Sequence, residues 1–250
     1  MMRAAPTLGN PELQLGPSSS PLPSPANLGW YRRFLPHRDD SGLIQFITYR
    51  LADSLPQAAL DRLESELAAL PPERMEPERR RRIEVWLDAG HGSCVLRDPA
   101  AAQIVVEAWR HFDGERYDLL AWVVMPNHVH VLVRVHQGKM LWKIVQSWKS
   151  FTGRRILEVV DKARAGARGS QECSAEGRRH VWMREYWDRF IRDEAHLMKS
   201  VEYIHQNPSR AGLVVHPEDW PWSSAAAAFE KEGGFTERFY RIRQARRAQP

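Results

Sequence analysis

Two histidines, His128 and His130, are separated by a single valine and directly follow a Pro-Asn pair. Alternate residues of a β-strand project from the same face about 7 Å apart, so two imidazoles in this pattern can bind one metal ion. The Pro-Asn turn places them at the start of a strand, where we expect an accessible end of the sheet. By itself, a His-x-His pair is also compatible with a purely structural role.

A tyrosine and an asparagine lie one turn apart on a helix expected from about Asp193 to Gln206, with Pro208 ending it. The buried stripe of this helix consists of apolar residues at i, i+4 and i+7: Leu197, Val201 and Ile204. Tyr203 falls outside the stripe and shares its face with polar residues: His196, Lys199, Ser200 and Asn207. An amphipathic surface tyrosine followed by an asparagine C-cap would give the same pattern.

These side chains together predict phosphoryl transfer. A divalent ion held by two imidazoles polarises a phosphodiester, and a tyrosine hydroxyl attacks phosphorus. Because a phenol with a pKa of about 10 is a weak nucleophile at neutral pH, the ion and the nearby Lys199 would have to favour the phenolate. A covalent phosphotyrosyl bond keeps the bond energy that hydrolysis would release, so strands can be exchanged without an external energy source.

The composition excludes several classes of protein. Among 250 residues, 36 Lys+Arg against 31 Asp+Glu give a formal charge of +5, which fits a polyanionic partner or a basic solvated surface. The longest apolar run, Leu119 to Met125, is far shorter than the roughly 20 residues of a membrane span. Cys94 and Cys173 provide neither a disulfide framework nor a paired-cysteine zinc site. With no secretory signal at the start, we expect a cytoplasmic protein.

Hydrophobic periodicity predicts an α+β domain, in which helices pack on one face of a small antiparallel sheet. Strands are expected over residues 43–51, 117–125 and 128–135, the last two forming a hairpin. Helices are expected over residues 57–70, 77–88 and 99–112 and from residue 140 onward, with a mobile loop over residues 161–180. We divide the chain into a Pro/Ser-rich disordered leader (1–29), one domain (30–224) and a basic tail (225–250).

Basic side chains near the expected site are candidate phosphate contacts. Arg134 shares the histidine face of its strand, and three residues flank the apolar stripe of the helix that begins near Met140: Lys143, Lys149 and Arg154. A run of four arginines, residues 79–82, points around all sides of its helix, which favours a solvated surface over a nucleic-acid contact.

Two separated motifs resemble one known family, the REP-associated tyrosine transposases, which are single-tyrosine HUH transposases. The first is MPNHVHVL at residues 125–132. The second is a C-terminal signature: YWDRFIRD at 186–193, VEYIHQNP at 201–208, AGLV at 211–214 and WPWSS at 220–224. The resemblance runs from about residue 30 to 224. The paired helices within residues 57–88 make this chain longer than compact members of that family.

This resemblance implies a ferredoxin-like antiparallel sheet of the HUH-endonuclease type. It also implies metal ligation by His128, His130 and Asn207, with Tyr203 as the nucleophile. The expected activity is that of a metal-dependent tyrosine DNA endonuclease and transposase, which cleaves single-stranded or hairpin DNA through a 5′-phosphotyrosine intermediate. Since Mg²⁺ prefers oxygen ligands and imidazoles suit Mn²⁺, either ion is compatible with the site, and weak, exchangeable binding is expected.

Two other functions remain open at this point. One is a module that recognises hairpin DNA without chemistry, and the other is a hydrolytic metallo-phosphodiesterase in which water replaces the tyrosine. Tyr186 is a rival nucleophile, although its aromatic neighbours favour a packing role. Both a monomer and a homodimer are compatible with the sequence.

Overall fold

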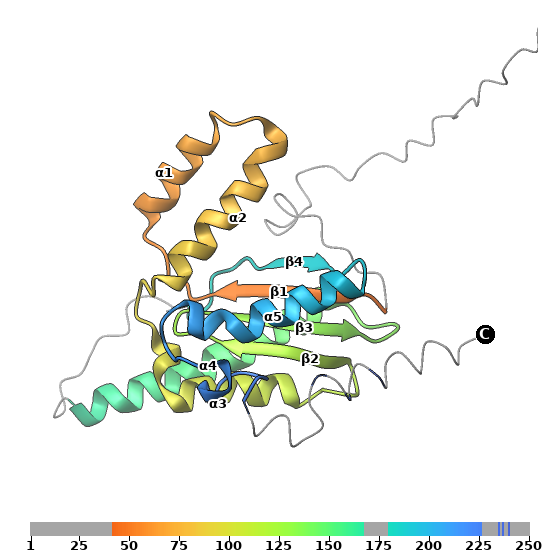
Figure 1. Ribbon diagram of the computed structural model, residues 1–250. Coiled ribbons are helices and arrows are strands. Elements are labelled where there is room, and N and C mark those ends of the chain that lie inside the picture. The colour runs from red at the N-terminus through yellow and green to blue at the C-terminus, as the bar shows by residue number, and fades with distance from the viewer. Residues whose placement is uncertain (1–41, 168–179, 227–234, 236, 238–239, 241–250) are drawn as a thin grey trace, which may run out of the picture. The chain divides into compact units, whose positions relative to one another are not determined.

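Four antiparallel strands form one sheet in the computed structural model of the chain (Figure 1), which describes residues 42–167, 180–226, 235, 237 and 240. The strands are β1 (Ile44–Arg50), β2 (Tyr117–Val124), β3 (His128–Val135) and β4 (Trp187–Phe190). Their order in the sheet is β2-β3-β1-β4. With helices after β1 and after β3, this is the β-α-β-β-α-β arrangement of a ferredoxin-like fold. The predicted α+β class and the β2–β3 hairpin are confirmed.

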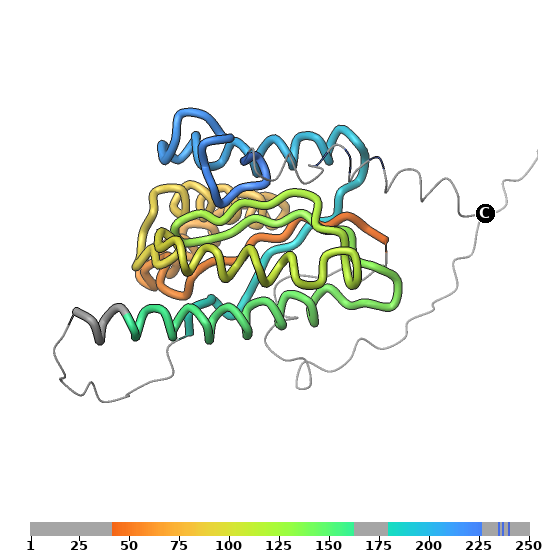
Figure 2. Tube along the Cα trace, turned by 90° about the horizontal axis from the view of Figure 1, so that it is seen from below, coloured from red at the N-terminus to blue at the C-terminus, as the bar shows by residue number. Residues whose placement is uncertain are grey.

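The described residues contain five α-helices besides the strands: α1 (Gln57–Leu67), α2 (Pro72–Asp88), α3 (Pro99–Arg110), α4 (Leu141–Ala167) and α5 (Glu194–Arg210). Figure 2 shows α4 and α5 on opposite sides of the strands. The structure thus corrects the expectation that helices pack on one face only. Both faces of the sheet carry apolar side chains, such as Val129 and Val131 on one face and Phe46 and Leu132 on the other, so each face is covered by helices of its own.

The face covered by α3 and α4 holds the larger core. As predicted, it takes every second residue of β3: Val129, Val131, Val133 and Val135. Trp109 of α3 is fully buried there and donates from Nε1 to the Tyr49 hydroxyl at 3.0 Å. The Tyr117 hydroxyl donates to the Trp109 carbonyl oxygen at 2.6 Å. These bonds satisfy the polar tips of the aromatic side chains inside an apolar layer.

The opposite face is covered by α5. Its apolar stripe is the one expected from the sequence, Leu197, Val201 and Ile204, and it packs on Phe46 of β1 and Leu132 of β3. Because the period of a strand is two, the histidines of β3 lie on this same face. They are therefore covered by a helix, and the sheet end that carries them is not the accessible one we expected.

Two segments extend beyond their expected limits. α4 continues to Ala167, so residues 161–167 are helical and not part of a loop, while residues 168–179 lie outside the described residues. α5 continues through Pro208 to Arg210 because Pro208 is buried, and its packing outweighs the loss of one backbone hydrogen bond. The expected leader (1–29) and most of the expected tail (225–250) also lie outside the described residues.

The last part of the WPWSS segment protects the edge of the sheet. Val124 of β2 donates its backbone N–H to the Trp222 carbonyl oxygen at 2.8 Å, and Ser224 donates to the Trp122 carbonyl oxygen at 2.9 Å. These bonds pair backbone groups that would otherwise be exposed on the edge strand β2. No helix in the described part of the chain is long and apolar enough to span a membrane.

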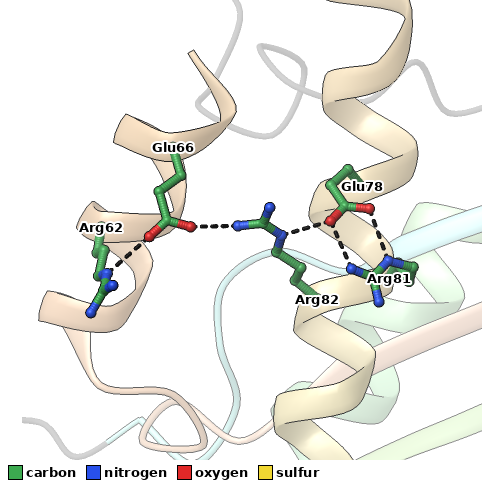
Figure 3. A network of polar contacts seen from close by, with 5 residues as sticks. All are labelled: Arg62, Glu66, Glu78, Arg81 and Arg82. Atoms are coloured by element: carbon green, nitrogen blue, oxygen red, sulfur yellow. Dashed lines mark hydrogen bonds and ion pairs between the residues drawn. The ribbon is translucent and has the colours of Figure 1, made fainter. Parts of the chain in front are cut away.

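α1 and α2 form a helical hairpin with a small core of its own, which includes Leu63, Ile83 and Leu87 and packs on Trp187 of β4. On its surface Arg82 bridges Glu66 of α1 and Glu78 of α2, and Arg81 also binds Glu78 (Figure 3). All four arginines of the 79–82 run pair with glutamates of the hairpin. This agrees with the interpretation of the run as a solvated helix surface.

We expect the stability of the hairpin to come from its apolar contacts. Leu63 is 1% exposed, so Leu63→Ala should lower the free energy of unfolding by about 2–5 kcal/mol. Arg82→Gln should leave it close to the wild-type value, since exposed ion pairs contribute little net free energy. Urea denaturation followed by circular dichroism measures both. A larger loss for Arg82→Gln than for Leu63→Ala would show that the ion pairs hold the hairpin together.

Candidate active site

His128 and His130 lie side by side on β3, with ring centroids 4.8 Å apart, as the strand period requires. They are 1% and 0% exposed. Burial lowers the pKa of His128 to about 3 and that of His130 well below its ordinary value, the latter also because of His128 and Arg189. Both imidazoles are thus neutral at pH 7, which is the form that binds metal ions.

Hydrogen bonds fix the orientation of the His128 ring. The Asn127 side chain donates from Nδ2 to the His91 carbonyl oxygen at 3.0 Å, which turns its Oδ1 toward His128 Nδ1 at 2.8 Å. An amide oxygen only accepts hydrogen bonds, so Nδ1 of His128 carries the proton and Nε2 has a free lone pair. The hydrogen bond at Nδ1 thus leaves Nε2 available to bind a cation.

His130 is held in a similar way from the neighbouring strand. Its Nδ1 lies 2.8 Å from Oγ1 of Thr48, its register partner on β1. Its Nε2 is buried and has no hydrogen-bond partner among the described residues. A buried polar atom without a partner is costly, and it points to a ligand that would satisfy it.

Tyr203 of α5 meets the histidine pair. Its ring packs edge-on against that of His130, with centroids 5.3 Å apart, and the Phe46 ring lies 5.9 Å from Tyr203 and 5.4 Å from His130. The tyrosine face of α5 is therefore turned toward the sheet and not toward solvent as expected. Burial raises the pKa of Tyr203 above its ordinary value, the carboxylates of Glu84 and Asp88 raise it further, and two arginines oppose them.

Asn207 lies one turn beyond Tyr203 and is 1% exposed. Its Oδ1 is buried without a hydrogen-bond partner in the described part of the chain. A surface C-cap would not be buried, so the structure disfavours that alternative. The Nε2 atoms of the two histidines and this amide oxygen form a donor set that fits a divalent ion of the Mn²⁺ or Mg²⁺ kind. Within the described ranges, no group of three or more His, Cys, Asp or Glu could hold a metal, so the set needs the amide.

Two acidic residues that the sequence analysis did not connect with the site come from α2. Asp88, the last residue of that helix, places Oδ1 3.9 Å from Nε2 of His128. Burial raises its pKa to about 6, Glu84 contributes to the rise, and Arg210 opposes it. Glu84 lies one turn earlier, and its pKa is also raised by burial. Nothing in the sequence of an apparently exposed helix signalled these positions.

Two arginines that the sequence analysis did not single out flank the tyrosine. Arg189 of β4 is the register partner of Phe46, and its guanidinium lies 4.7 Å from the Phe46 ring. The guanidinium of Arg210 lies 5.4 Å from the Tyr203 ring. Both residues are exposed, so positive charge stands at the surface around the tyrosine, where a phosphate could reach it.

Most of the basic residues that we expected to contact phosphate lie away from the histidine pair. Lys143, Lys149 and Arg154 belong to α4, on the face opposite the histidines. Lys149 donates to the Arg184 carbonyl oxygen at 2.7 Å, and burial lowers its pKa to about 8. Arg134 binds Asp118 at 2.7 Å, about 13 Å along β3 from His130.

Lys199 stays near the site, exposed one turn before Tyr203 on α5. The rival tyrosine, Tyr186, is 6% exposed and belongs to the core on the α4 side. The structure thus brings together His128, His130 and Tyr203, with Asn207 buried one turn farther along α5, and leaves the α4 residues, Arg134 and Tyr186 outside.

Comparison with known proteins agrees with these motifs. Residues 109–207, which include the histidine pair, Tyr203 and Asn207, match the family described as "Transposase IS200 like". A REP-associated tyrosine transposase of Escherichia coli (strain K12) is 27% identical over 108 residues, which are 43% of this chain and 54% of that protein. A relative from Haemophilus influenzae with a name of the same kind is 27% identical over 108 residues, 43% of this chain and 58% of that protein.

The match spans little more than half the length of these curated relatives. A solved structure, that of a REP-associated tyrosine transposase bound to a REP hairpin, aligns with 76% of this chain and 81% of its own, at 16% identity and a TM-score of 0.42. The resemblance indicated by the two motifs is confirmed in sequence: over 108 residues this chain is similar to REP-associated tyrosine transposases, and its segment 109–207 matches the IS200-like transposase family.

Proposed function

We propose that this protein is a DNA strand-transferase of the transposase type, which cleaves single-stranded or hairpin DNA and forms a 5′-phosphotyrosine bond at Tyr203. The single observation that carries the proposal is the ring contact of 5.3 Å between His130 and Tyr203, which joins a candidate metal ligand to a candidate nucleophile. The REP-associated names of the relatives support the choice of hairpin DNA as substrate.

His128, His130 and Asn207 would hold the divalent ion, with Nε2, Nε2 and Oδ1 as donors. When bound, the ion supplies Lewis acidity toward the scissile phosphate. The hydrogen bonds that the two imidazoles make with Asn127 and Thr48 keep the rings oriented, so little rearrangement precedes binding. A preference between Mg²⁺ and Mn²⁺ is not part of the proposal.

The step at phosphorus is a transesterification. The Tyr203 hydroxyl oxygen attacks, a bond forms between that oxygen and phosphorus, and the bond from phosphorus to the 3′ oxygen breaks. The phenol loses one proton and the leaving 3′ hydroxyl gains one, so protons balance. Since burial and the α2 carboxylates raise the pKa of Tyr203, the phenol is protonated at neutral pH in the metal-free protein.

Arg189 and Arg210 are placed to hold the phosphate. They lie on two sides of the Phe46–Tyr203 aromatic contact, and both lower the pKa of Tyr203 by their charge. Guanidinium groups bind phosphate oxygens through paired hydrogen bonds. Lys199, one turn before the tyrosine, extends the same positive surface along α5. We propose this surface, and not α4, as the main path of the DNA strand.

The covalent intermediate provides the decisive test. Incubated with a labelled single-stranded hairpin and Mn²⁺ or Mg²⁺, the wild type should give an adduct that survives denaturant and disappears with protease. Tyr203→Phe should abolish this band, while Tyr186→Phe should keep it. Loss of the band with Tyr186→Phe alone would refute the assignment. Free 5′-phosphate ends with both variants would favour the hydrolytic alternative.

Removal of the metal separates an enzyme from a binding module. Treatment with EDTA, or His130→Ala, should abolish the adduct by removing the Lewis acid, and Mn²⁺ should restore it for the EDTA-treated wild type only. Hairpin binding is measured in parallel by fluorescence anisotropy. Binding by wild type and His130→Ala alike, with no cleavage by either at any metal concentration, would indicate a DNA-binding module without chemistry.

The path of the DNA is tested by the salt dependence of binding. Arg189→Gln and Arg210→Gln should each weaken single-strand binding and reduce the slope of log K against log salt by about 0.7 per lost phosphate contact. Lys143→Gln and Arg154→Gln, on the opposite face, should change the slope less. The reverse ranking would show that DNA runs along α4.

A further inference from the structure

The end of α2 presents a carboxylate to the histidine pair in a way that hydrogen bonding does not explain. Asp88 Oδ1 lies 3.9 Å from Nε2 of His128. This distance is too long for a hydrogen bond. At this separation, a water molecule coordinated to a cation on Nε2 would lie within hydrogen-bond reach of Oδ1, since metal–ligand distances are about 2.0–2.3 Å.

Neither Nε2 of His128 nor Oδ1 of Asp88 donates a hydrogen bond to the other. His128 holds its proton on Nδ1, where Asn127 Oδ1 accepts it at 2.8 Å, so Nε2 presents a lone pair. Asp88 Oδ1 is buried and has no hydrogen-bond partner among the described residues. Two hydrogen-bond acceptors that face each other in a buried place repel unless a cation lies between or beside them.

Two further acceptors of the proposed site lack partners, one on the histidine neighbouring His128 and one a turn beyond Tyr203 on α5. Nε2 of His130 and Oδ1 of Asn207 are also buried without partners in the described part of the chain. Two imidazoles and one amide are a neutral donor set, and hard divalent ions favour sites that include a carboxylate. Arg189 and Arg210 add positive charge close by, which increases the benefit of one negative ligand.

We propose that Asp88 helps to hold the cation of His128 and His130 through one coordinated water, which would donate a hydrogen bond to the Asp88 carboxylate. The proposal rests on the metal site of the proposed function and extends it. It also gives a role to the α1–α2 hairpin, which lies outside the matched segment 109–207 and carries this carboxylate at the end of its second helix.

The test is Mn²⁺ binding to the metal-free protein without DNA, measured by calorimetry and by the electron paramagnetic resonance of free Mn²⁺. Asp88→Asn keeps the shape and removes the charge, and should weaken Mn²⁺ binding at least tenfold. Asp88→Glu keeps a carboxylate and should bind more tightly than Asp88→Asn. Glu84→Gln removes the same charge one turn away and should stay within threefold of the wild type. Circular dichroism checks folding, and Asp88→Ser replaces any variant that does not fold.

The outcomes distinguish this proposal from the one on which it rests. Wild-type affinity in Asp88→Asn, with loss of binding in His130→Ala, would overturn the role of Asp88 and leave the histidine site intact. Equal losses in Asp88→Asn and Glu84→Gln would also overturn it, because they would show a general effect of charge. No saturable Mn²⁺ binding by the wild type would instead refute the metal site of the proposed function.

Discussion

The contact between the rings of His130 and Tyr203 joins the centre of the sheet to the last long helix, and every chemical property of the site depends on it. It exists because α5 lies across the histidine face and packs its apolar stripe on Phe46 and Leu132. Hydrophobic burial thus supplies the free energy that holds a nucleophile and a metal ligand together, at the cost of burying polar atoms.

Those polar atoms explain the character of the site. The Nδ1 atoms of the two histidines are hydrogen-bonded to Asn127 and Thr48. Nε2 of His130 and Oδ1 of Asn207 have no partner among the described residues. A fold does not gain stability from such an arrangement. Under the proposed function the site is preorganised, and the free energy lost on burial would be recovered when a cation and a phosphate bind.

Groups of opposite charge near Tyr203 shift its pKa in opposite directions. α2 brings the carboxylates of Glu84 and Asp88, which raise the pKa of the phenol, while Arg189 and Arg210 lower it. Under the proposed function, an anionic substrate and a cationic metal would therefore have separate places to bind. The helical hairpin, which is stabilised on its own surface by arginine–glutamate pairs, contributes to the site through the last turn of one helix.

The sequence by itself determined the elements and the face of each side chain. Period two in β3 separates its valines from its histidines, and period 3.6 in α5 separates Leu197, Val201 and Ile204 from Tyr203, because local backbone geometry sets both periods. Only the tertiary structure decided what lies opposite those faces. In the folded chain the histidines are buried, Asp88 and Arg189 lie near them, and α4 with its lysines lies on the opposite face of the sheet. Such contacts join residues far apart in the chain, and they depend on how layers pack, which no local pattern encodes.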